Sequence, residues 1–263
     1  MSCSYRQGAG VRISWILNLT TKLSQVIFLV LVMMCWGGRA NAASSQYIVL
    51  EGGVQSGGAI SGTIVFNGTA PDPEVFEVDT DESYCGLKAY SEELVVGSNG
   101  GIKNVVLSIE NIDTGKAWDF PTKFIFDQNK CKFNPHVMII KSKSEGVVLN
   151  SDDVVHNIHT ISRGIFNINK STNGHSETRI KEKKIRKPGV IRVKCDMHYW
   201  MKGWWIVAKN PYTVSTNQDG EFLIEDVPAG SYNIKAWHEK LGESEYSVEV
   251  KADETAQLNV TLG

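Results

Sequence analysis

The chain has 263 residues, of which 42% are hydrophobic and 21% are charged, and its formal net charge at pH 7 is −2. This is an ordinary globular composition, and the length allows one large domain or two small ones. The lack of a net positive charge argues against nucleic acid as a partner, because nucleic-acid-binding domains present a strongly basic surface.

The first 42 residues are typical of a cleavable export signal. They contain four basic residues and no acidic residue, an apolar run at residues 26–36, and the small-x-small tripeptide Ala40-Asn41-Ala42. The apolar run is shorter than the roughly 20 residues that a helix needs to cross a bilayer. We therefore expect cleavage after Ala42 and a periplasmic protein without a membrane span. Its 23 Lys and Arg residues then face 29 Asp and Glu residues, a net charge of about −6.

Three cysteines remain after cleavage: Cys85, Cys131 and Cys195. An oxidising compartment tends to pair cysteines, so an odd number leaves one for other chemistry. Cys195 is the natural unpaired one, because it alone has a histidine and a methionine at ligand spacing. We predict a disulfide between Cys85 and Cys131.

Short runs of alternating or β-branched residues predict strands through the chain, and Gly, Asn, Asp and Pro residues separate them. No segment after residue 45 has a sustained helical period. The sequence therefore predicts an all-β protein. The expected strands of its larger domain, residues 43–210, include 59–66, 75–78, 105–109, 124–126, 137–141, 146–149 and 190–194.

A second, smaller unit is predicted at residues 211–263. Its D-G-x-F strand followed by a P-x-G-x-Y strand resembles the carboxypeptidase-regulatory-like β-sandwich module. About fifty residues bury only a small core, so we expect this unit to pack against the rest of the chain. Residues 54–70 have a similar pattern and could pair with it. The expected strands of the unit are 221–224, 232–237, 246–250 and 257–262.

Residues 195–201 place three soft metal donors at C-x-x-H-x-x-M spacing, namely Cys195, His198 and Met201. The electron-transfer copper site needs two imidazoles and a thiolate in one plane, with a weak axial methionine. A strand at 190–194 would deliver Cys195 at its end, where a short loop can turn the other two donors onto the same metal. A second histidine must come from elsewhere, and His156 lies about forty residues upstream, after an acidic turn.

Other residues compete for two of these positions. His159 follows His156 by three residues, and side chains three apart on a strand point to opposite faces, so the two histidines compete for one ligand position. His136 is a third candidate, although a histidine at the start of a strand is more commonly structural. Met197 competes with Met201, but its place inside the C-x-x-H turn would direct it away from the metal.

The pattern of His156-Asn157 after an N-x-D turn, followed by C-x-x-H-x-x-M, resembles the cupredoxins over about residues 124–208. The short ligand loop is most similar to that of amicyanin. The resemblance implies a Greek-key β-sandwich that holds copper through the ligand set His156, Cys195, His198 and Met201. It also favours His156 over His159, because the family pattern places the ligand histidine directly before the asparagine, here Asn157.

Two neighbours of the ligands bear on this resemblance. Asn157 would correspond to the asparagine that braces the ligand loop in cupredoxins. Asp196 departs from the pattern, because relatives commonly carry a small hydroxyl residue there. An anion beside the thiolate is expected to lower the reduction potential.

Two surface features suggest where a redox partner could dock. Tyr199 and Trp200 could form an apolar rim around His198, although aromatic residues in β-sandwiches usually fill space. Residues 179–187 hold six basic residues in nine, including Lys183 and Lys184. Such a run is usually a solvated strand face. The alternative is a docking patch for an acidic redox partner.

Together these features predict a periplasmic type 1 copper protein that carries single electrons between redox proteins and is not itself an enzyme. The resemblance suggests an amine dehydrogenase or a cytochrome as partner. Two other functions stay open: a copper carrier or sensor with an exchangeable site, and a metal-free β-sandwich interaction module.

Overall fold

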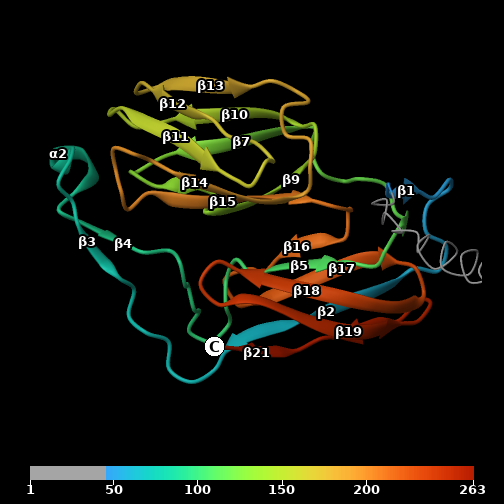
Figure 1. The fold of residues 1–263 in the computed structure, drawn as a ribbon. Coiled ribbons are helices and arrows are strands. Elements are labelled where there is room, and N and C mark those ends of the chain that lie inside the picture. Colours follow the sequence, from blue (N-terminus) through green and yellow to red (C-terminus); the bar gives the residue numbers. More distant parts are fainter. Residues whose placement is uncertain (1–45) are drawn as a thin grey trace, which may run out of the picture. The chain divides into compact units, whose positions relative to one another are not determined.

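The structure, a computed structural model, describes residues 46–263, and strands form nearly all of its regular structure. The predicted signal peptide at residues 1–42 lies outside the described residues. Within them, no helix is long and apolar enough to cross a membrane. The strands build two β-sandwiches, shown in Figure 1. The prediction of an all-β protein, with a Greek-key sandwich and a second sandwich module, is confirmed.

The first sandwich consists of two mixed sheets, and the chain passes repeatedly from one to the other. Strands β7 and β10 are parallel neighbours in the first sheet, and β9 and β15 are parallel neighbours in the second. The first sheet has the order β13 (Ser176–Ile180), β10 (Glu145–Asn150), β7 (Lys123–Gln128), β8 (Phe133–Asn134). The second has the order β12 (Asn169–Thr172), β11 (His156–Ile161), β14 (Gly189–Lys194), β15 (Lys202–Ala208), β9 (Val137–Lys141).

The core of this sandwich follows from the two-residue period of its strands. In β14, Ile191 and Val193 are buried, whereas Arg192 between them is exposed. Phe126 and Trp205 meet edge to face in the core, with ring centroids 5.3 Å apart. Burying each large apolar side chain contributes about 1.5–3 kcal/mol. This packing holds the ends of β11, β14 and β15 in place, and the candidate ligands lie at these ends.

The second sandwich draws on three separate stretches of the chain. One sheet has the order β16 (Thr213–Ser215), β5 (Val106–Ile109), β18 (Gly230–His238), β19 (Gly242–Val250). The other has the order β17 (Glu221–Val227), β2 (Gly58–Phe66), β20 (Thr255–Gln257), and β21 (Val260–Leu262) also pairs with β2. Its core is a cluster of apolar side chains around Ile60, Leu107 and Ile234.

The domain boundary expected at residue 210 therefore differs from the arrangement in the structure. Strand β2 pairs with β17 across residues 58–63 and 221–227, as the pattern at 54–70 suggested. Strand β5 also lies in the second sandwich, between β16 and β18, although the expected domain at 43–210 includes it. The physical reason is the small size of the C-terminal unit, which needs strands from outside itself to close a core.

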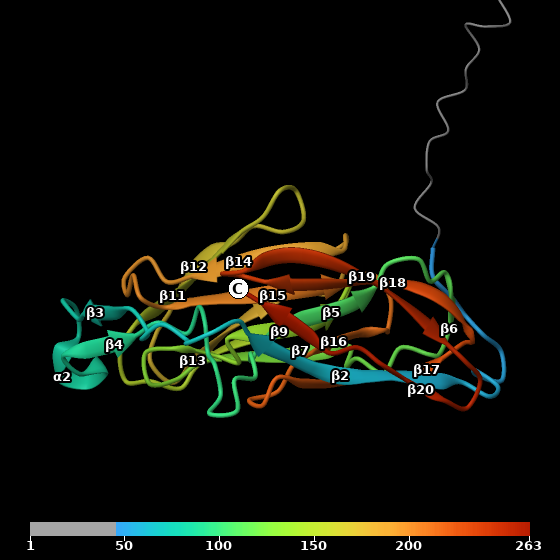
Figure 2. The same ribbon diagram turned by 90° about the horizontal axis from the view of Figure 1, so that it is seen from below.

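A short segment between β2 and β5 of the second sandwich extends to one end of the first. It contains β3 (Val75–Glu77), α2 (Glu82–Cys85) and β4 (Lys88–Tyr90), and β3 and β4 form a two-stranded ladder. Figures 1 and 2 both place it at the same end of the first sandwich. We call residues 74–90 the cover segment. Only its first strand was expected from the sequence.

The two sandwiches meet along β15 and β9 of the first and β5 and β18 of the second. Val106, Val137 and Ile206 form a small apolar cluster there. Trp204 packs edge to face on Trp237, with ring centroids 5.3 Å apart. Short parallel strands β1 (Ile48–Val49) and β6 (Thr114–Gly115) complete the fold.

Candidate metal centre

The strand register brings His156 to the loop that carries the other three candidate ligands. His159 of β11 lies opposite Lys194 of β14, the last residue before that loop. Because β11 and β14 are antiparallel, the residues of β11 that precede His159 extend past the end of β14. His156 therefore lies alongside the loop. Lys194 also pairs with Lys202 of β15, so residues 195–201 form a closed turn between two paired strands.

Hydrogen bonds within the turn set its shape. The backbone N–H of Cys195 donates to the carbonyl of Met201 at 3.1 Å, and the N–H of Met201 donates to the carbonyl of His198 at 2.9 Å. Asn157 braces the turn from β11, as the resemblance implied. Its backbone N–H lies 3.4 Å from Cys195 Sγ, and its side-chain oxygen accepts the N–H of Asp196 at 2.5 Å.

The donor atoms of three predicted ligands converge at one point. His156 Nδ1 and His198 Nδ1 lie 2.9 Å apart, and Cys195 Sγ lies 3.7 Å from His198 Nδ1. A single ion with bonds of about 2.0 Å to nitrogen and 2.3 Å to sulfur can reach all three atoms at such separations. Met201 lies buried in the same core cluster as Cys195. All four side chains are 2% exposed or less, and the thioether together with the thiolate favours copper among the transition metals.

Hydrogen bonds and nearby charges shift the pKa values of the thiol and of one imidazole in the site. Burial by itself raises the pKa of the Cys195 thiol, but hydrogen bonds with His156, His198 and the Asn157 backbone outweigh it and lower this pKa to about 6. Burial also acts to lower the pKa of His198, but hydrogen bonding and charge attraction to Cys195 and Asp81 raise it overall. A thiolate is the form of cysteine that binds a metal, so the site favours the ligand state without an ion present.

Two carboxylates orient the imidazoles from behind. Asp152 Oδ2 lies 2.7 Å from His156 Nε2, and Asp81 Oδ2 lies 3.0 Å from His198 Nε2. Such contacts at the outer ring nitrogen fix the tautomer, so that the inner Nδ1 lone pair faces the metal position. Neither role was expected from the sequence. Asp152 had a local signal, since it stands four residues before His156, but Asp81 is 117 residues from His198.

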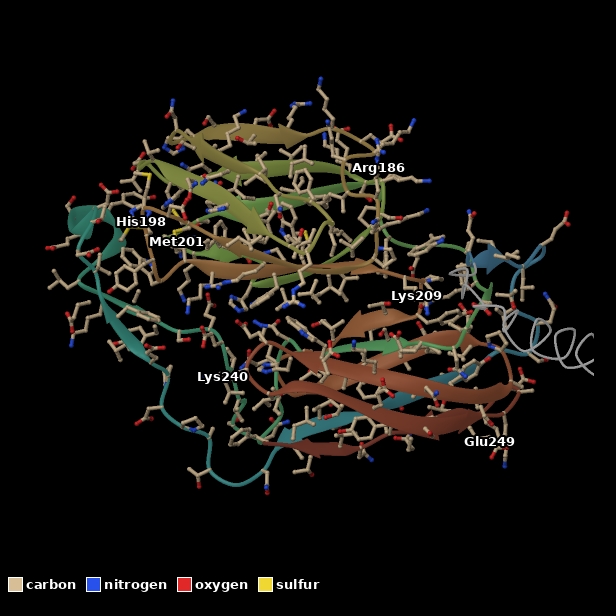
Figure 3. All side chains as sticks on the ribbon, viewed as in Figure 1. Arg186, His198, Met201, Lys209, Lys240 and Glu249 are labelled. Carbon is tan, nitrogen blue, oxygen red and sulfur yellow. A yellow bond between two sulfur atoms is a disulfide. The ribbon has the colours of Figure 1, made fainter. Side chains whose placement is uncertain are left out.

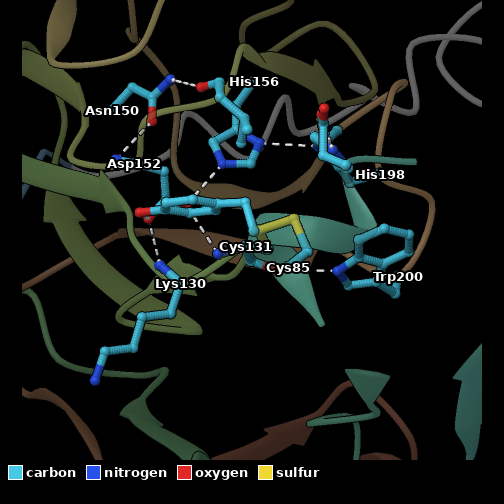
Figure 4. Close-up of a disulfide and its surroundings, with 12 residues drawn as sticks. Cys85, Lys130, Cys131, Asn150, Asp152, His156, His198 and Trp200 are labelled. Atoms are coloured by element: carbon cyan, nitrogen blue, oxygen red, sulfur yellow. Dashed lines mark hydrogen bonds and ion pairs between the residues drawn. A yellow bond between two sulfur atoms is a disulfide. The ribbon is translucent and has the colours of Figure 1, made fainter. Parts of the chain in front are cut away.

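Asp152 is itself held firmly, as Figure 4 shows. Its carboxylate accepts backbone N–H groups from Lys130 at 2.6 Å and Cys131 at 2.8 Å, and the Tyr84 hydroxyl at 3.1 Å. Burial acts to raise the pKa of Asp152, but these hydrogen bonds and the one with His156 lower it overall. His156, a candidate ligand, is therefore held by a carboxylate that stays ionised.

The predicted disulfide between Cys85 and Cys131 is present, with 5.6 Å between the two Cα atoms. It attaches the cover segment beside the metal centre. Trp200 donates its indole N–H to the Cys131 carbonyl at 3.1 Å. Cys131, Asp152 and His156 also lie close enough together to form a ligand group, but the Cys131 sulfur is already bonded to Cys85. Cys195 is the free cysteine of the described chain.

The competing candidates lie away from the convergent donors. His159 Nδ1 pairs with Asp196 at 2.9 Å, on the outer side of β11. His136 pairs through Nε2 with Glu239 of the second sandwich. Met197 is 40% exposed, whereas Met201 is buried.

Asp196 lies in an ion cluster at the protein surface. A hydrogen bond with Lys194 is the main reason that the pKa of Asp196 is held well below its usual range, and His159 adds to the effect. The Lys194 ammonium, 2.7 Å from the carboxylate, offsets the negative charge that was expected to lower the reduction potential.

The proposed docking residues lie in different places. Tyr199 is exposed, whereas Trp200 is buried and packs against His198 with ring centroids 5.1 Å apart. The basic run at 179–187, with Lys183 and Lys184, precedes β14, and β14 runs the length of the sandwich to Cys195. Six strand residues span roughly 20 Å. Figure 3 shows Arg186 of this run at the opposite end of the first sandwich from His198 and Met201. Docking at either place stays a prediction.

The chain is similar to known proteins in two parts. The family profile of the carboxypeptidase regulatory-like domain matches residues 205–263. Comparison with curated protein sequences finds no match.

Three solved structures are similar to part of this chain. A Cu-containing nitrite reductase from Thermus scotoductus is 19% identical over 38% of this chain and 25% of its own, with a TM-score of 0.30. A purple cupredoxin from Nitrosopumilus maritimus is 20% identical over 32% of this chain and 98% of its own, with a TM-score of 0.27. Amicyanin from Paracoccus versutus is 20% identical over 34% of this chain and 86% of its own, with a TM-score of 0.29. The matched region spans a quarter of the length of the nitrite reductase.

Proposed function

We propose that this chain is an exported type 1 copper protein that carries one electron at a time between redox proteins in the periplasm. The observation that carries the proposal is the convergence of His156, Cys195 and His198, with Met201 buried beside them. Copper, when bound, supplies the one-electron redox chemistry. The protein is proposed to have no enzymatic activity of its own, because its own side chains fill the space around the metal position and exclude a substrate.

The side chains of the site are suited to hold one geometry in both oxidation states. The Asn157 N–H donates to the thiolate, Asp152 holds the imidazole of His156, and Asp81 holds that of His198. Because His156, Cys195 and His198 are each held by a hydrogen bond to a neighbouring residue, little rearrangement is expected to accompany gain or loss of an electron. The buried ligands also favour a permanently held ion over the exposed, exchangeable site that a copper carrier or sensor needs.

The test is titration of the metal-free protein with Cu(II). An intense visible absorption that is bleached by a reductant and restored by an oxidant is expected at one copper per chain. His156→Ala should weaken binding strongly and alter the absorption, because it removes a donor, whereas the matched variant His159→Ala should bind copper like the parent. Replacing Met201 by Leu should keep the colour and raise the reduction potential, because it removes a weak donor that favours Cu(II).

Each alternative function has its own signature in this experiment. Copper that binds without intense colour and passes readily to a chelator indicates a carrier. No stoichiometric binding indicates a metal-free interaction module. If His156→Ala binds copper like the parent and His159→Ala does not bind it, the ligand assignment is wrong.

A further inference from the structure

The cover segment, residues 74–90, closes the surface over His198. The His198 side chain has no exposed surface, and its outer nitrogen, Nε2, is bonded to Asp81 of this segment. The metal centre therefore has no direct contact with solvent through this imidazole. A protein that approaches the site at this end of the sandwich meets the cover segment first.

Four contacts fasten the inner side of the cover segment to the first sandwich. Besides the disulfide from Cys85, Tyr84 donates to Asp152, and the backbone carbonyl of Glu77 accepts the hydroxyl of Tyr199 at 2.6 Å. Phe76 packs edge to face on Tyr199, with ring centroids 5.7 Å apart. The segment is thus a fixed part of the metal end of the molecule.

The outer side of the same segment exposes apolar side chains beside charged ones. In the ladder of β3 and β4, Val75 lies opposite Tyr90 and faces outward, whereas Phe76 and Ala89 face the core of the first sandwich. Val75 is 47% exposed, Tyr90 55% and Leu87 70%. Exposed apolar side chains with a polar rim are a feature of protein–protein interaction surfaces.

Charge around these apolar side chains has one dominant sign. Glu74, Glu77, Asp79 and Glu82 are exposed on the segment, and Lys88 is its single basic residue. The Lys88 ammonium is 3.8 Å from Glu77, so one acidic charge is partly compensated. A partner that fits this surface carries lysine or arginine residues around an apolar contact area.

We infer that the outer side of the cover segment is the docking surface for the redox partner, and that this partner is a protein with a basic rim around an apolar contact area. This rests on the proposed function and specifies its partner. Electron tunnelling weakens exponentially with distance, so a productive complex needs the partner close to the metal. The cover segment touches a ligand through Asp81, whereas the basic run at 179–187 lies at the opposite end of the sandwich.

The first test measures docking with the metal-free protein, using a basic ferric c-type cytochrome as the probe and calorimetry at about 10 mM salt, where screening is weak. Glu74→Gln/Glu82→Gln should raise Kd about tenfold, because it removes two attractive charges. The difference should shrink in about 0.3 M salt. Leu87→Ser should raise Kd at both salt concentrations, because it removes an apolar contact.

The matched control is Glu249→Gln/Glu254→Gln, which makes the same change in net charge on exposed residues of the second sandwich. Figure 3 shows Glu249 far from His198. This control should change Kd less than twofold. The inference would be overturned if the cover-segment variant, the control and the parent had equal Kd values. It would also be overturned if both double variants raised Kd by the same factor.

The second test measures electron transfer in the copper-loaded protein. One electron passes from the cuprous protein to the ferric haem, which leaves the cupric protein and a ferrous haem. Glu74→Gln/Glu82→Gln should slow this reaction at low salt and should speed oxidation by the hexacyanoferrate(III) anion, because the same acidic charges repel an anion. A change of the same sign with both oxidants would contradict docking on this surface. Failure of the copper titration refutes the proposed function, whereas the binding test on the metal-free protein still decides the docking surface.

Discussion

Buried polar side chains have different hydrogen-bond partners at the metal end of the first sandwich and in the core of the second. In the second sandwich, Tyr212 donates to the carbonyl of Asp226 and Thr216 donates to that of Ile102, so these side chains satisfy backbone groups. At the metal end, Asp152 also accepts two backbone N–H groups, but Asp152, His156 and His198 in addition hydrogen-bond to one another. Buried polar groups are stable only when bonded, and groups that bond to the backbone serve the fold.

The difference teaches how to recognise the functional region. Titratable side chains whose bonds converge on each other, with perturbed pKa values, occur mainly at binding and catalytic sites. A convergent group of this kind, formed by His156, Cys195 and His198, lies at one end of the first sandwich. The following experiments test whether function resides in the first sandwich alone.

The largest effect is expected from Cys195→Ser. A serine hydroxyl does not ionise near neutral pH, so the copper form should lose its intense visible absorption while circular dichroism still reports a folded β protein. Visible spectroscopy of the copper-titrated variant is the measurement. Met197→Leu, an exposed position in the same loop, should stay coloured, and an intensely coloured Cys195→Ser protein would refute the ligand assignment.

Ile234→Ala tests the opposite region. Ile234 is fully buried in the second sandwich, so its truncation should lower the free energy of unfolding by about 2–5 kcal/mol. The copper spectrum of the folded protein should not change. Denaturant unfolding followed by fluorescence, with the visible spectrum recorded before the transition, gives both readouts. Leu223→Ala, at an exposed position of β17, is the control and should change stability by less than about 0.5 kcal/mol. An altered copper spectrum in Ile234→Ala would show that the second sandwich shapes the metal centre.

Asp152→Asn tests the support behind a ligand. The amide turns an NH₂ group or a weaker acceptor toward His156 and toward two backbone N–H groups, so copper affinity should fall about 10–100-fold. Stability should fall by about 1–3 kcal/mol, because buried donors lose their acceptor. Competition with a chelator measures the affinity. Asp153→Asn changes the exposed neighbour and should leave both quantities unchanged, whereas equal effects at the two positions would contradict a specific role for Asp152.

The smallest effect is expected from Glu93→Gln, where the two regions are joined by charge. Glu93 lies 2.6 Å from Lys202 of the first sandwich and 3.3 Å from Lys240 of the second. The hydrogen bond from Lys202 lowers the pKa of Glu93 more than burial raises it, and Lys240 lowers it further. Ionised Glu93 therefore contributes fully to the free energy of unfolding above its unfolded-state pKa of about 4.3. This contribution is lost as the pH falls through the lower folded-state pKa of Glu93.

The expected loss in Glu93→Gln is below about 1 kcal/mol at pH 7 and should vanish in acid, because protonated Glu93 is also neutral. Unfolding free energies of the variant and the parent, measured from pH 7 downward, give the comparison. A difference that does not depend on pH would assign the effect to packing instead of charge.

Much of the site could be predicted from short sequence patterns. The spacing of Cys195, His198 and Met201 lies within one turn, and the alternation of apolar residues placed the strand before it. The strand period predicts that His156 and His159 face opposite sides, and the choice of His156 came from the resemblance, which places the ligand histidine directly before an asparagine. The disulfide could be predicted because only three cysteines remain and one of them belongs to the ligand motif.

The sequence by itself thus determined the all-β class, many of the strands and the disulfide, because each depends on residues close together or on few candidates. The ligand set that it predicts stays a proposal. Only the tertiary structure decided that β5 joins the second sandwich, that Asp81 covers His198 and that the basic run lies at the opposite end from the ligands. These features depend on pairings between distant residues, which local periodicity does not encode. The basic run shows the reason most clearly: it is near Cys195 in sequence, but an intervening strand carries the chain across the whole sandwich.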